Sequence, residues 1–275
     1  MQFLEKPLFY LCLLNSFVLL SFANSKTDNM IVRKKTKPFH FKQFSISQDR
    51  CAMKVGTDGV LLGAWVDVEA ASTILDIGAG TGLIAIMMAQ RTTNSLIDAV
   101  EIDNEAFEQA TENMQDSPWS KRLNAIHIAI QDYTQATAKQ YDLIVSNPPF
   151  FSGGTFSNTE NRNLVRHTVK LPNGDLLASV RSLLTQNGKF SVILPTLEGL
   201  RFQERAQNYR LYCTKMTEIK PKRDKSVERI LLQFEKEAKP LIKNSLVIQF
   251  EERNHFTDEY IALTGNFYLK MKKRV

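Results

Sequence analysis

Cysteine and histidine are scarce in this chain of 275 residues, and their spacing excludes two kinds of stabilised fold. The three cysteines, Cys12, Cys51 and Cys213, are odd in number and far apart, and no CxxC pair occurs. The four histidines are scattered. These patterns argue against a disulfide framework and against a structural zinc site, so we expect no bound metal. A reduced, cytoplasmic compartment fits this use of cysteine best.

Long hydrophobic runs are also absent from the chain, except for one near its start. Residues 8–22 are almost wholly apolar, but the run is too short to span a membrane comfortably. It has the form of a signal peptide, although Glu5 beside Lys6 weakens the basic region that such a peptide needs. Met30 then opens a basic segment. We expect residues 1–29 to be an over-extended start, with no stable membrane association; a cleaved leader and export are the alternative.

Net positive charge is missing from most of the chain and is concentrated at its end. Residues 201–275 carry 17 Lys and Arg against 10 Asp and Glu, whereas residues 1–200 carry 18 against 19. The composition is otherwise that of an ordinary globular protein, with 43% hydrophobic and 23% charged residues. A localised basic surface suggests a polyanion such as nucleic acid, and a solvated lysine-rich surface is an equal alternative.

A buried strand, a glycine-rich turn and a helix follow one another from residue 72 onwards. The turn has the pattern G-x-G-x-G through Gly78, Gly80 and Gly82, and Asp76 precedes it by two residues. Glycines let a backbone approach a ligand closely. A carboxylate at this point repels a pyrophosphate but suits a cationic amino-acid ligand. The pattern therefore favours S-adenosylmethionine over a dinucleotide.

Two further acids follow the next two predicted strands. Glu101 ends the strand over residues 96–100, about 20 residues after the glycine turn, where an acid can take both hydroxyls of a ribose. Asp103 is predicted to cap the helix that follows. Asp132 comes after the strand over residues 125–129, where it can hold the amino group of an adenine. A simple turn residue is the alternative for Asp132.

The strand over residues 141–145 is followed by Ser146 and then by Asn147, Pro148, Pro149 and Phe150. The Asn side-chain oxygen and the first proline carbonyl can each accept an N–H from a flat amino group, and the phenylalanine ring can stack on it. The prolines fix the direction of the loop carbonyls. A strand that ends in a proline turn is the alternative. Because the carboxyl ends of parallel strands meet at one edge, we expect all four loops to form one site.

Capping signals and charge predict the remaining features. Thr57 or Asp58 is expected to cap a short helix that ends near residue 65, and Asn187-Gly188 to end a helix that begins at Asp175. The irregular segment over residues 151–170 is expected to be a substrate loop. The basic residues expected to hold a nucleic-acid backbone are Arg162, Arg166, Lys222, Arg223 and Lys225.

With the glycine turn and the Asn147–Phe150 segment in hand, the chain resembles a class I S-adenosylmethionine-dependent methyltransferase with a (D/N/S)-P-P-(F/Y/W) signature. More of the chain is similar to the bacterial tRNA1(Val) adenine-37 N6-methyltransferase family. The segments that carry this resemblance, in order and with compatible spacing, are Phe41–Phe44, Asp49–Gly59, Leu62–Trp65, Asn147–Phe151 and Arg166–Thr168. The similarity covers roughly residues 31–270, and residues 1–29 have no counterpart in the family.

The resemblance implies an α/β, Rossmann-like fold with a mostly parallel seven-stranded sheet and helices on both faces. It implies an N-terminal hairpin and helix over residues 30–70 and a methyltransferase domain over residues 71–275. S-adenosylmethionine is then the methyl donor, and the target is adenine 37 in the anticodon loop of tRNA1(Val). The donor site is expected at Asp76, Gly78, Gly80, Gly82, Glu101, Asp132 and Asn147, and the acceptor base at Asn147, Pro148, Pro149 and Phe150.

Other functions fit the same motifs. The same fold can methylate an adenine of ribosomal RNA or DNA, or a glutamine side chain of a protein. A non-catalytic RNA-binding module with this fold is a rival from another class. An NAD-dependent enzyme is the weakest alternative, because the glycine spacing and Asp76 both disfavour it.

Overall fold

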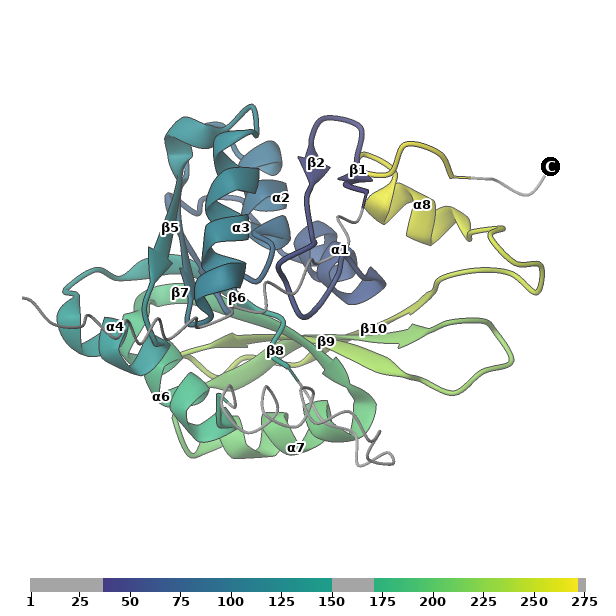
Figure 1. The fold of residues 1–275 in the computed structure, drawn as a ribbon. Helices are drawn as coiled ribbons and strands as arrows, with labels where there is room; N and C mark the ends of the chain where they lie inside the picture. Colours follow the sequence, from purple (N-terminus) through teal and green to yellow (C-terminus); the bar gives the residue numbers. More distant parts are fainter. Residues whose placement is uncertain (1–36, 150–170, 272–275) are drawn as a thin grey trace, which may run out of the picture. The chain divides into compact units, whose positions relative to one another are not determined.

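The central sheet has eight strands in the order β10-β8-β9-β7-β6-β3-β4-β5 (Figure 1). The computed structural model describes residues 37–149 and 171–271. The elements in chain order are β1 (Phe39–His40), β2 (Ser45–Ile46), α1 (Thr57–Trp65), β3 (Thr73–Ile77), α2 (Leu83–Arg91), β4 (Leu96–Glu101), α3 (Asn104–Gln115), η1 (Ser120–Arg122), β5 (Leu123–His127), α4 (Ile130–Ala136), β6 (Tyr141–Ser146), α6 (Asn173–Leu183), β7 (Leu184–Pro195), α7 (Thr196–Gln207), β8 (Tyr212–Lys220), β9 (Arg229–Glu235), β10 (Ile242–Val247) and α8 (Asp258–Thr264).

The middle of the sheet is parallel, as predicted. β5, β4, β3, β6 and β7 run in one direction, and β9 pairs antiparallel with both β7 and β8. The prediction of seven strands was wrong by one in the described residues, because β10 pairs in parallel with β8 and forms an eighth. This edge strand is short and mostly exposed. Four of its six residues are exposed, so little apolar burial marks where it begins.

Helices cover both faces of the sheet (Figure 1). One face packs against α1, α2 and α3, and the other against α6 and α7, with α4 in contact with α6. The two faces bury separate apolar clusters, which include Met87 and Ile193 on the first and Tyr141, Phe190 and Phe234 on the second. A strand buried on both sides reads as an unbroken apolar run. This is why β3 and β6 could be predicted from sequence.

Two predicted helix ends were wrong. The helix expected to reach Asn187-Gly188 ends at Leu183, and β7 begins at Leu184 by pairing with Tyr141 before a register shift. The N-cap of α1 is Gly56, without a side-chain cap bond. Asp58 does not cap this helix, because it lies inside the first turn; its carboxylate accepts a hydrogen bond from Arg229. By contrast Asp103 caps α3 as predicted, accepting the Ala106 N–H at 2.8 Å.

The N-terminal hairpin of β1 and β2 joins the rest of the fold at two places. Asn113 on α3 exchanges hydrogen bonds with the Ser47 backbone, each at 2.9 Å. Phe41 forms an antiparallel bridge with Tyr268, and Lys42 N donates to Phe267 O at 2.8 Å. The N-terminal and C-terminal parts of the described chain are therefore in direct backbone contact.

Several predictions fall outside the described residues. These are residues 1–29 with the start at Met30, Phe150, and the segment over residues 151–170 with Arg162 and Arg166. The domain boundaries at residues 30 and 71 stay a prediction. Across residues 37–149 and 171–271, no helix is long and apolar enough to cross a membrane.

Candidate active site

All four predicted loops leave the sheet at one edge, because β5, the strand before Asp132, also runs parallel to β4. β3 leads into the glycine turn, β4 ends at Glu101, and β6 leads through Ser146 to Asn147. The strands are neighbours in the order β6-β3-β4 and run parallel. The hydroxyl of Ser146 donates to Ile77 O at 2.9 Å and so ties the ends of β6 and β3 together. Parallel pairing therefore brings together side chains that are up to about 70 residues apart in the sequence.

All three glycines of the turn have left-handed backbone conformations, with φ of 72° at Gly78, 56° at Gly80 and 77° at Gly82. A side chain is strained in this region, which explains the glycines. They differ in their surroundings. A Cβ added at Gly78 or Gly80 meets nothing within 4 Å, whereas one at Gly82 would lie 3.2 Å from Met114 Cε. The first two glycines therefore leave space above the turn, and the third allows close packing on α3.

Asp76 is fully buried below the turn. Its Oδ2 accepts the Ala85 N–H at 3.2 Å, and its Oδ1 has no hydrogen-bond partner among the described residues. Burial raises the pKa of Asp76 to about 7; the Ala85 hydrogen bond opposes this rise and the charge of Glu101 adds to it. An orphaned buried carboxylate oxygen costs free energy until a donor reaches it. A positively charged ammonium is a donor that fits.

Glu101 holds the turn through its carboxylate. Its Oε2 accepts the Gly80 N–H at 2.8 Å, and its Oε1 accepts the Ile102 and Asp103 N–H groups at 2.8 and 2.9 Å. A carboxylate has about four acceptor positions. One therefore remains, which is enough for one ribose hydroxyl, whereas binding both hydroxyls requires the Gly80 bond to open.

Asp132 follows the fourth of these strands, β5. It is exposed, in the first turn of α4, five residues beyond the end of β5. It does not line the cavity described below. A contact with a bound adenine stays a prediction for this residue.

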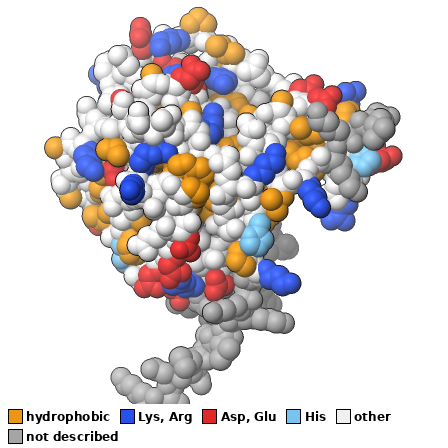
Figure 2. All heavy atoms as spheres, turned by 90° about the horizontal axis from the view of Figure 1, so that it is seen from above, with side chains coloured by type: hydrophobic (Ala, Val, Ile, Leu, Met, Phe, Trp, Pro, Cys, Tyr) orange, Lys and Arg blue, Asp and Glu red, His pale blue; other side chains and the backbone are white. Residues whose placement is uncertain are grey.

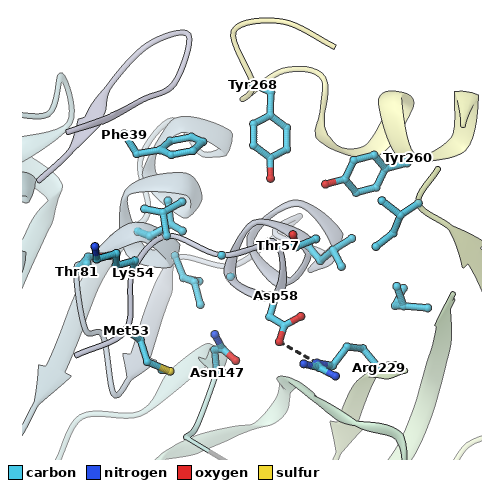
Figure 3. A pocket seen from close by; sticks show the side chains of 18 of the residues that line it. Phe39, Met53, Lys54, Thr57, Asp58, Thr81, Asn147, Arg229, Tyr260 and Tyr268 are labelled. Carbon is cyan, nitrogen blue, oxygen red and sulfur yellow. Dashed lines mark hydrogen bonds and ion pairs between the residues drawn. The ribbon is translucent and has the colours of Figure 1, made fainter. Parts of the chain in front are cut away.

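A cavity of about 940 Å³ opens in front of the glycine turn (Figure 3). Gly78, Gly80 and Asn147 line it, and Asn147 is only partly buried. Behind Asn147, Pro148 is buried and Pro149 is exposed. The remaining lining comes from the segment before α1, the ends of β8 and β9, and the C-terminal part around α8. The predicted donor turn and the predicted acceptor clamp thus share one space.

The sequence motif around Asp49–Gly59 proves to form one wall of this space. Gln48 Oε1 accepts the Val55 N–H at 2.8 Å, and the Arg50 guanidinium pairs with Glu108 and Glu112 on α3. Asn113 also donates to Thr81 O in the glycine turn at 2.9 Å. One helix therefore positions both the turn and this wall. The prediction that Asp58 caps α1 did not include the role of its segment as a wall of the cavity.

Asp58 and Arg229 form an ion pair beside Asn147 (Figure 3). The Arg229 Nε lies 2.9 Å from Asp58 Oδ2, and both residues line the cavity. They are 171 residues apart in the chain. No local pattern links two such positions, so sequence reasoning did not find this pair.

The basic connection between β8 and β9 packs against the loop that follows β10. Pro221 O accepts the Gln249 N–H at 3.1 Å, and Lys222 Nζ donates to Glu251 O at 2.6 Å. Arg223 lies over the Phe250 ring, 5.6 Å from its centroid. Lys225 lies beside Asp224, at 3.5 Å. Pro221 also lines the cavity, so the basic residues adjoin its far wall.

Charge on the face seen from above is mixed. Figure 2 shows Lys and Arg side chains spread over several parts of this face, with apolar and acidic side chains between them. Within the described residues, no group of three or more His, Cys, Asp or Glu side chains is arranged to hold a metal ion.

Comparison with known proteins places this geometry in a family. The methyltransferase small domain matches residues 51–212. The tRNA1(Val) (adenine(37)-N6)-methyltransferase of Trichodesmium erythraeum is 48% identical over 234 residues, which are 84% of this chain and 98% of that protein. The enzyme of the same name from Flavobacterium psychrophilum is 47% identical over 85% of this chain and 100% of its own.

The chain belongs to the tRNA1(Val) (adenine(37)-N6)-methyltransferase family.

The fold is that of other methyltransferases. A solved structure of a predicted O-methyltransferase from Agrobacterium tumefaciens superposes with a TM-score of 0.62, over 79% of this chain and 99% of that one, at 18% identity. This likeness shows the Rossmann-like fold alone. It confirms the predicted class of mostly parallel sheet with helices on both faces.

The family match also divides the cavity. Residues 51–212 contain the glycine turn, the Met53–Gly59 wall and Asn147. The opposite wall comes from outside that match, from Phe39 before it and from residues 219–271 after it. The part shared with the wider methyltransferase domain therefore carries the predicted chemistry, and the flanking segments complete the cavity.

Proposed function

We propose that this protein transfers a methyl group from S-adenosylmethionine to the N6 atom of adenine 37 in tRNA1(Val). The observation that carries the proposal is the shared cavity, in which Asn147 stands beside the open glycine turn. The family membership names the same reaction for the relatives. The donor site, the acceptor clamp and the RNA surface described next are parts of this proposal.

The residues around the glycine turn fit S-adenosylmethionine. Gly78 and Gly80 leave room for a ligand against the backbone, and the unpartnered oxygen of buried Asp76 suits an ammonium group. Glu101 has an acceptor position left for a ribose hydroxyl. When bound, this cofactor supplies an activated methyl group on a sulfonium. The protein's task is then to present the acceptor nitrogen.

Asn147 and Pro148 present that nitrogen. The lone pair of adenine N6 is delocalised into the ring, which makes the amino group a poor nucleophile. The Asn147 side-chain oxygen and the Pro148 carbonyl can each accept one N–H of this group. These bonds favour a pyramidal nitrogen and stabilise the positive charge that develops on it during transfer, a case of electrostatic preorganisation. No strong base is required, because the proton can leave after the methyl group has moved.

The RNA partner is held by basic surface near the cavity. Lys222, Arg223 and Lys225 adjoin its far wall, and their charges suit a phosphate backbone. Phe150, Arg162 and Arg166 keep their proposed roles in stacking and phosphate contact from the sequence motif alone. A base in an anticodon loop is unpaired, so little energy is needed to bring it into the cavity.

Methyl transfer with defined RNA tests the function. The purified protein is incubated with methyl-labelled S-adenosylmethionine and tRNA1(Val) transcripts that carry either adenine or guanine at position 37. We expect label only in the adenine transcript, recovered as N6-methyladenosine after nuclease digestion. Label in ribosomal RNA, DNA or a release-factor glutamine but not in tRNA refutes the substrate, and no transfer to any of them refutes the enzyme.

A further inference from the structure

Aromatic side chains from the two ends of the described chain face the glycine turn across the cavity. Phe39 comes from β1, Tyr260 from α8, and Tyr268 from the segment after α8. All three line the cavity. Figure 3 shows them on the side opposite Asn147, with both tyrosine hydroxyls pointing into the space. This wall lies outside the region matched by the general methyltransferase domain.

The wall is rigidly built. Tyr268 bridges to Phe41, and its ring centroid lies 5.9 Å from that of Phe41 and 6.3 Å from that of Phe39. Lys42 N donates to Phe267 O at 2.8 Å on the same strand pair. A binding surface held by backbone pairing loses little conformational entropy when a ligand arrives.

The aromatic residues of the hairpin divide into two kinds. Phe41 and Phe44 are 4% and 7% exposed and belong to the apolar core. Phe39 and Tyr268 are only partly buried and reach the cavity. Packing explains the first pair. It leaves unexplained why the second pair turns part of its surface into the space in front of Asn147.

The hydroxyls of Tyr260 and Tyr268 add hydrogen-bonding capacity. Burial raises the pKa of both phenols, and the hydrogen bond that Tyr268 makes with Tyr260 raises the pKa of Tyr268 further. Both groups therefore stay protonated near neutral pH. Tyr268 donates to Tyr260, so one phenol proton of the pair is left for an acceptor on a base edge. Lys54 and Lys270 line the same cavity and supply positive charge. Aromatic rings beside cations are the surface that single-stranded nucleic acid binds.

The cavity is also larger than one reacting base requires. Pockets for a single drug-sized ligand measure roughly 300–1,000 Å³, and this cavity measures about 940 Å³. Glu101 and Asp132, the expected partners of the adenosyl part of the donor, do not line it. The cavity is thus at the upper end of this range, and its aromatic side chains lie on the side away from Asn147.

We propose that Phe39, Tyr260 and Tyr268 form a subsite for the base of the nucleotide next to the methylated adenine. The base packs against the rings of Phe39 and Tyr268 and accepts one hydrogen bond from the phenol pair, while its phosphate lies near Lys54 and Lys270. These residues then determine which sequence around the target is accepted. The inference rests on the proposed function, because it assigns a neighbour to the adenine held at Asn147.

A mutant cycle between protein and RNA tests the subsite. tRNA1(Val) is prepared intact, or with an abasic nucleotide immediately before or immediately after adenine 37. Methyl transfer is measured as kcat/KM for the wild type and for Tyr268→Leu. We expect Tyr268→Leu to lose on the order of tenfold on intact tRNA, as for removal of one base–aromatic stack, mainly through KM. We expect one of the two abasic tRNAs to lower kcat/KM of the wild type by the same factor. The same abasic tRNA should not lower kcat/KM of Tyr268→Leu any further.

Two further variants separate binding from folding. Phe44→Leu changes a buried ring of the same hairpin; it lowers the melting temperature, but the abasic effect should remain that of the wild type. Tyr268→Phe keeps the ring and its packing, so it should fold normally and lose only the part of the base preference that the hydroxyl supplies. S-adenosylmethionine affinity, measured by calorimetry, should stay within twofold for both Tyr268 variants.

The outcomes are distinct. Two results overturn the subsite. In the first, the loss of kcat/KM from Tyr268→Leu multiplies with the loss from each abasic tRNA, whichever side of adenine 37 is abasic. In the second, the wild type methylates both abasic tRNAs as well as intact tRNA. In those cases methyl transfer to intact tRNA still supports the proposed function. A wild type without activity on any tRNA overturns the function and the subsite together.

Discussion

The two walls of the cavity are built in different ways. The wall at the glycine turn comes from the middle of the sheet, and its backbone is held closely: Gly78 N and Ala79 N both donate to Val100 O, at 2.9 and 3.1 Å, and Gly80 N donates to Glu101. The opposite wall comes from the ends of the chain and presents the rings of Phe39 and Tyr268. The first wall offers backbone, carboxylate and amide groups, and the second offers rings, phenols and Lys270.

Under the proposed function, this difference assigns methyl transfer to the first wall and RNA recognition to the second. The glycine-turn wall belongs to the domain that many methyltransferases share, and the aromatic wall lies outside it. A reaction common to many enzymes needs the same few groups at the same strand ends. Choice of substrate is free to vary in segments added around them. Changes to the first wall should therefore affect turnover or donor binding, and changes to the second should affect RNA binding.

The largest effect is expected at Asn147, where the two walls meet. Asn147→Ala removes an acceptor for the amino group, so we expect kcat to fall on the order of 100-fold, similar to the loss of one preorganised hydrogen bond to a transition state. S-adenosylmethionine affinity should change only a few-fold. Single-turnover methyl transfer and calorimetry measure the two quantities. Unchanged turnover would rule out the clamp.

The glycine turn offers a matched pair of substitutions. Gly80→Ala places a methyl group in open space above the turn, and Gly82→Ala places one against Met114 and Ala110. Both replacements strain a left-handed backbone, by about 1–2 kcal/mol. We expect Gly80→Ala to weaken S-adenosylmethionine binding by at least tenfold, beyond its effect on unfolding. Gly82→Ala should chiefly lower the free energy of unfolding.

Calorimetry and urea denaturation of the two glycine variants distinguish these effects. Equal loss of donor affinity in both variants would show that strain alone, rather than a blocked ligand site, explains the result. A Gly80→Ala protein that binds the donor normally would place the donor elsewhere.

Asp76 gives the glycine-turn wall a pH dependence. Its pKa is raised to about 7 in the folded protein, whereas the unfolded chain has a value near 4. The folded state therefore holds an extra proton between these pH values, and the free energy of unfolding falls as pH rises through this window. Asp76→Asn does not titrate in this window. Relative to this variant, we expect the free energy of unfolding of the wild type to fall by about 2–3 kcal/mol between pH 5 and pH 8.

Urea denaturation of both proteins across this pH range measures the effect. Bound S-adenosylmethionine should weaken the trend, because its ammonium favours the ionised carboxylate and lowers the pKa of Asp76. The donor should therefore bind the wild type more tightly at pH 8 than at pH 6. A constant difference between the two proteins at every pH would mean that Asp76 is ionised throughout.

The smallest effect is expected from the basic connection beside the aromatic wall. Replacing Lys222, Arg223 and Lys225 by Gln should weaken tRNA binding several-fold. The slope of the logarithm of the binding constant against the logarithm of salt concentration should fall by up to about 3, or about 1 for each phosphate that the protein no longer neutralises. Arg201→Gln with Arg205→Gln is a control, because these exposed residues lie on α7, on the other face of the sheet. Titrations at several salt concentrations compare the slopes. An unaltered slope would remove the connection from the RNA surface.

Much of the fold could be predicted from the sequence, because apolar runs and capping residues act over short stretches of the chain. The strands before the glycine turn and before Asn147 are short and mostly apolar, and the cap at Asp103 is a contact between neighbours in sequence. Local signals failed where a distant partner competes. Asp58 is a good capping residue by type, but it lies inside the first turn of α1 and its carboxylate pairs with Arg229. Leu184 continues a helical pattern, but pairing with Tyr141 makes it part of a strand.

The sequence by itself determined the class of chemistry. A G-x-G-x-G turn after an acid and an Asn-Pro-Pro-Phe segment after an apolar strand indicate their ligands through residue type and spacing, and these are local properties. Only the tertiary structure decided what faces them. Asn113 joins the turn to Ser47, and pairing of Phe41 with Tyr268 closes the opposite side. Such contacts join residues far apart in the chain, and no periodicity or spacing records them.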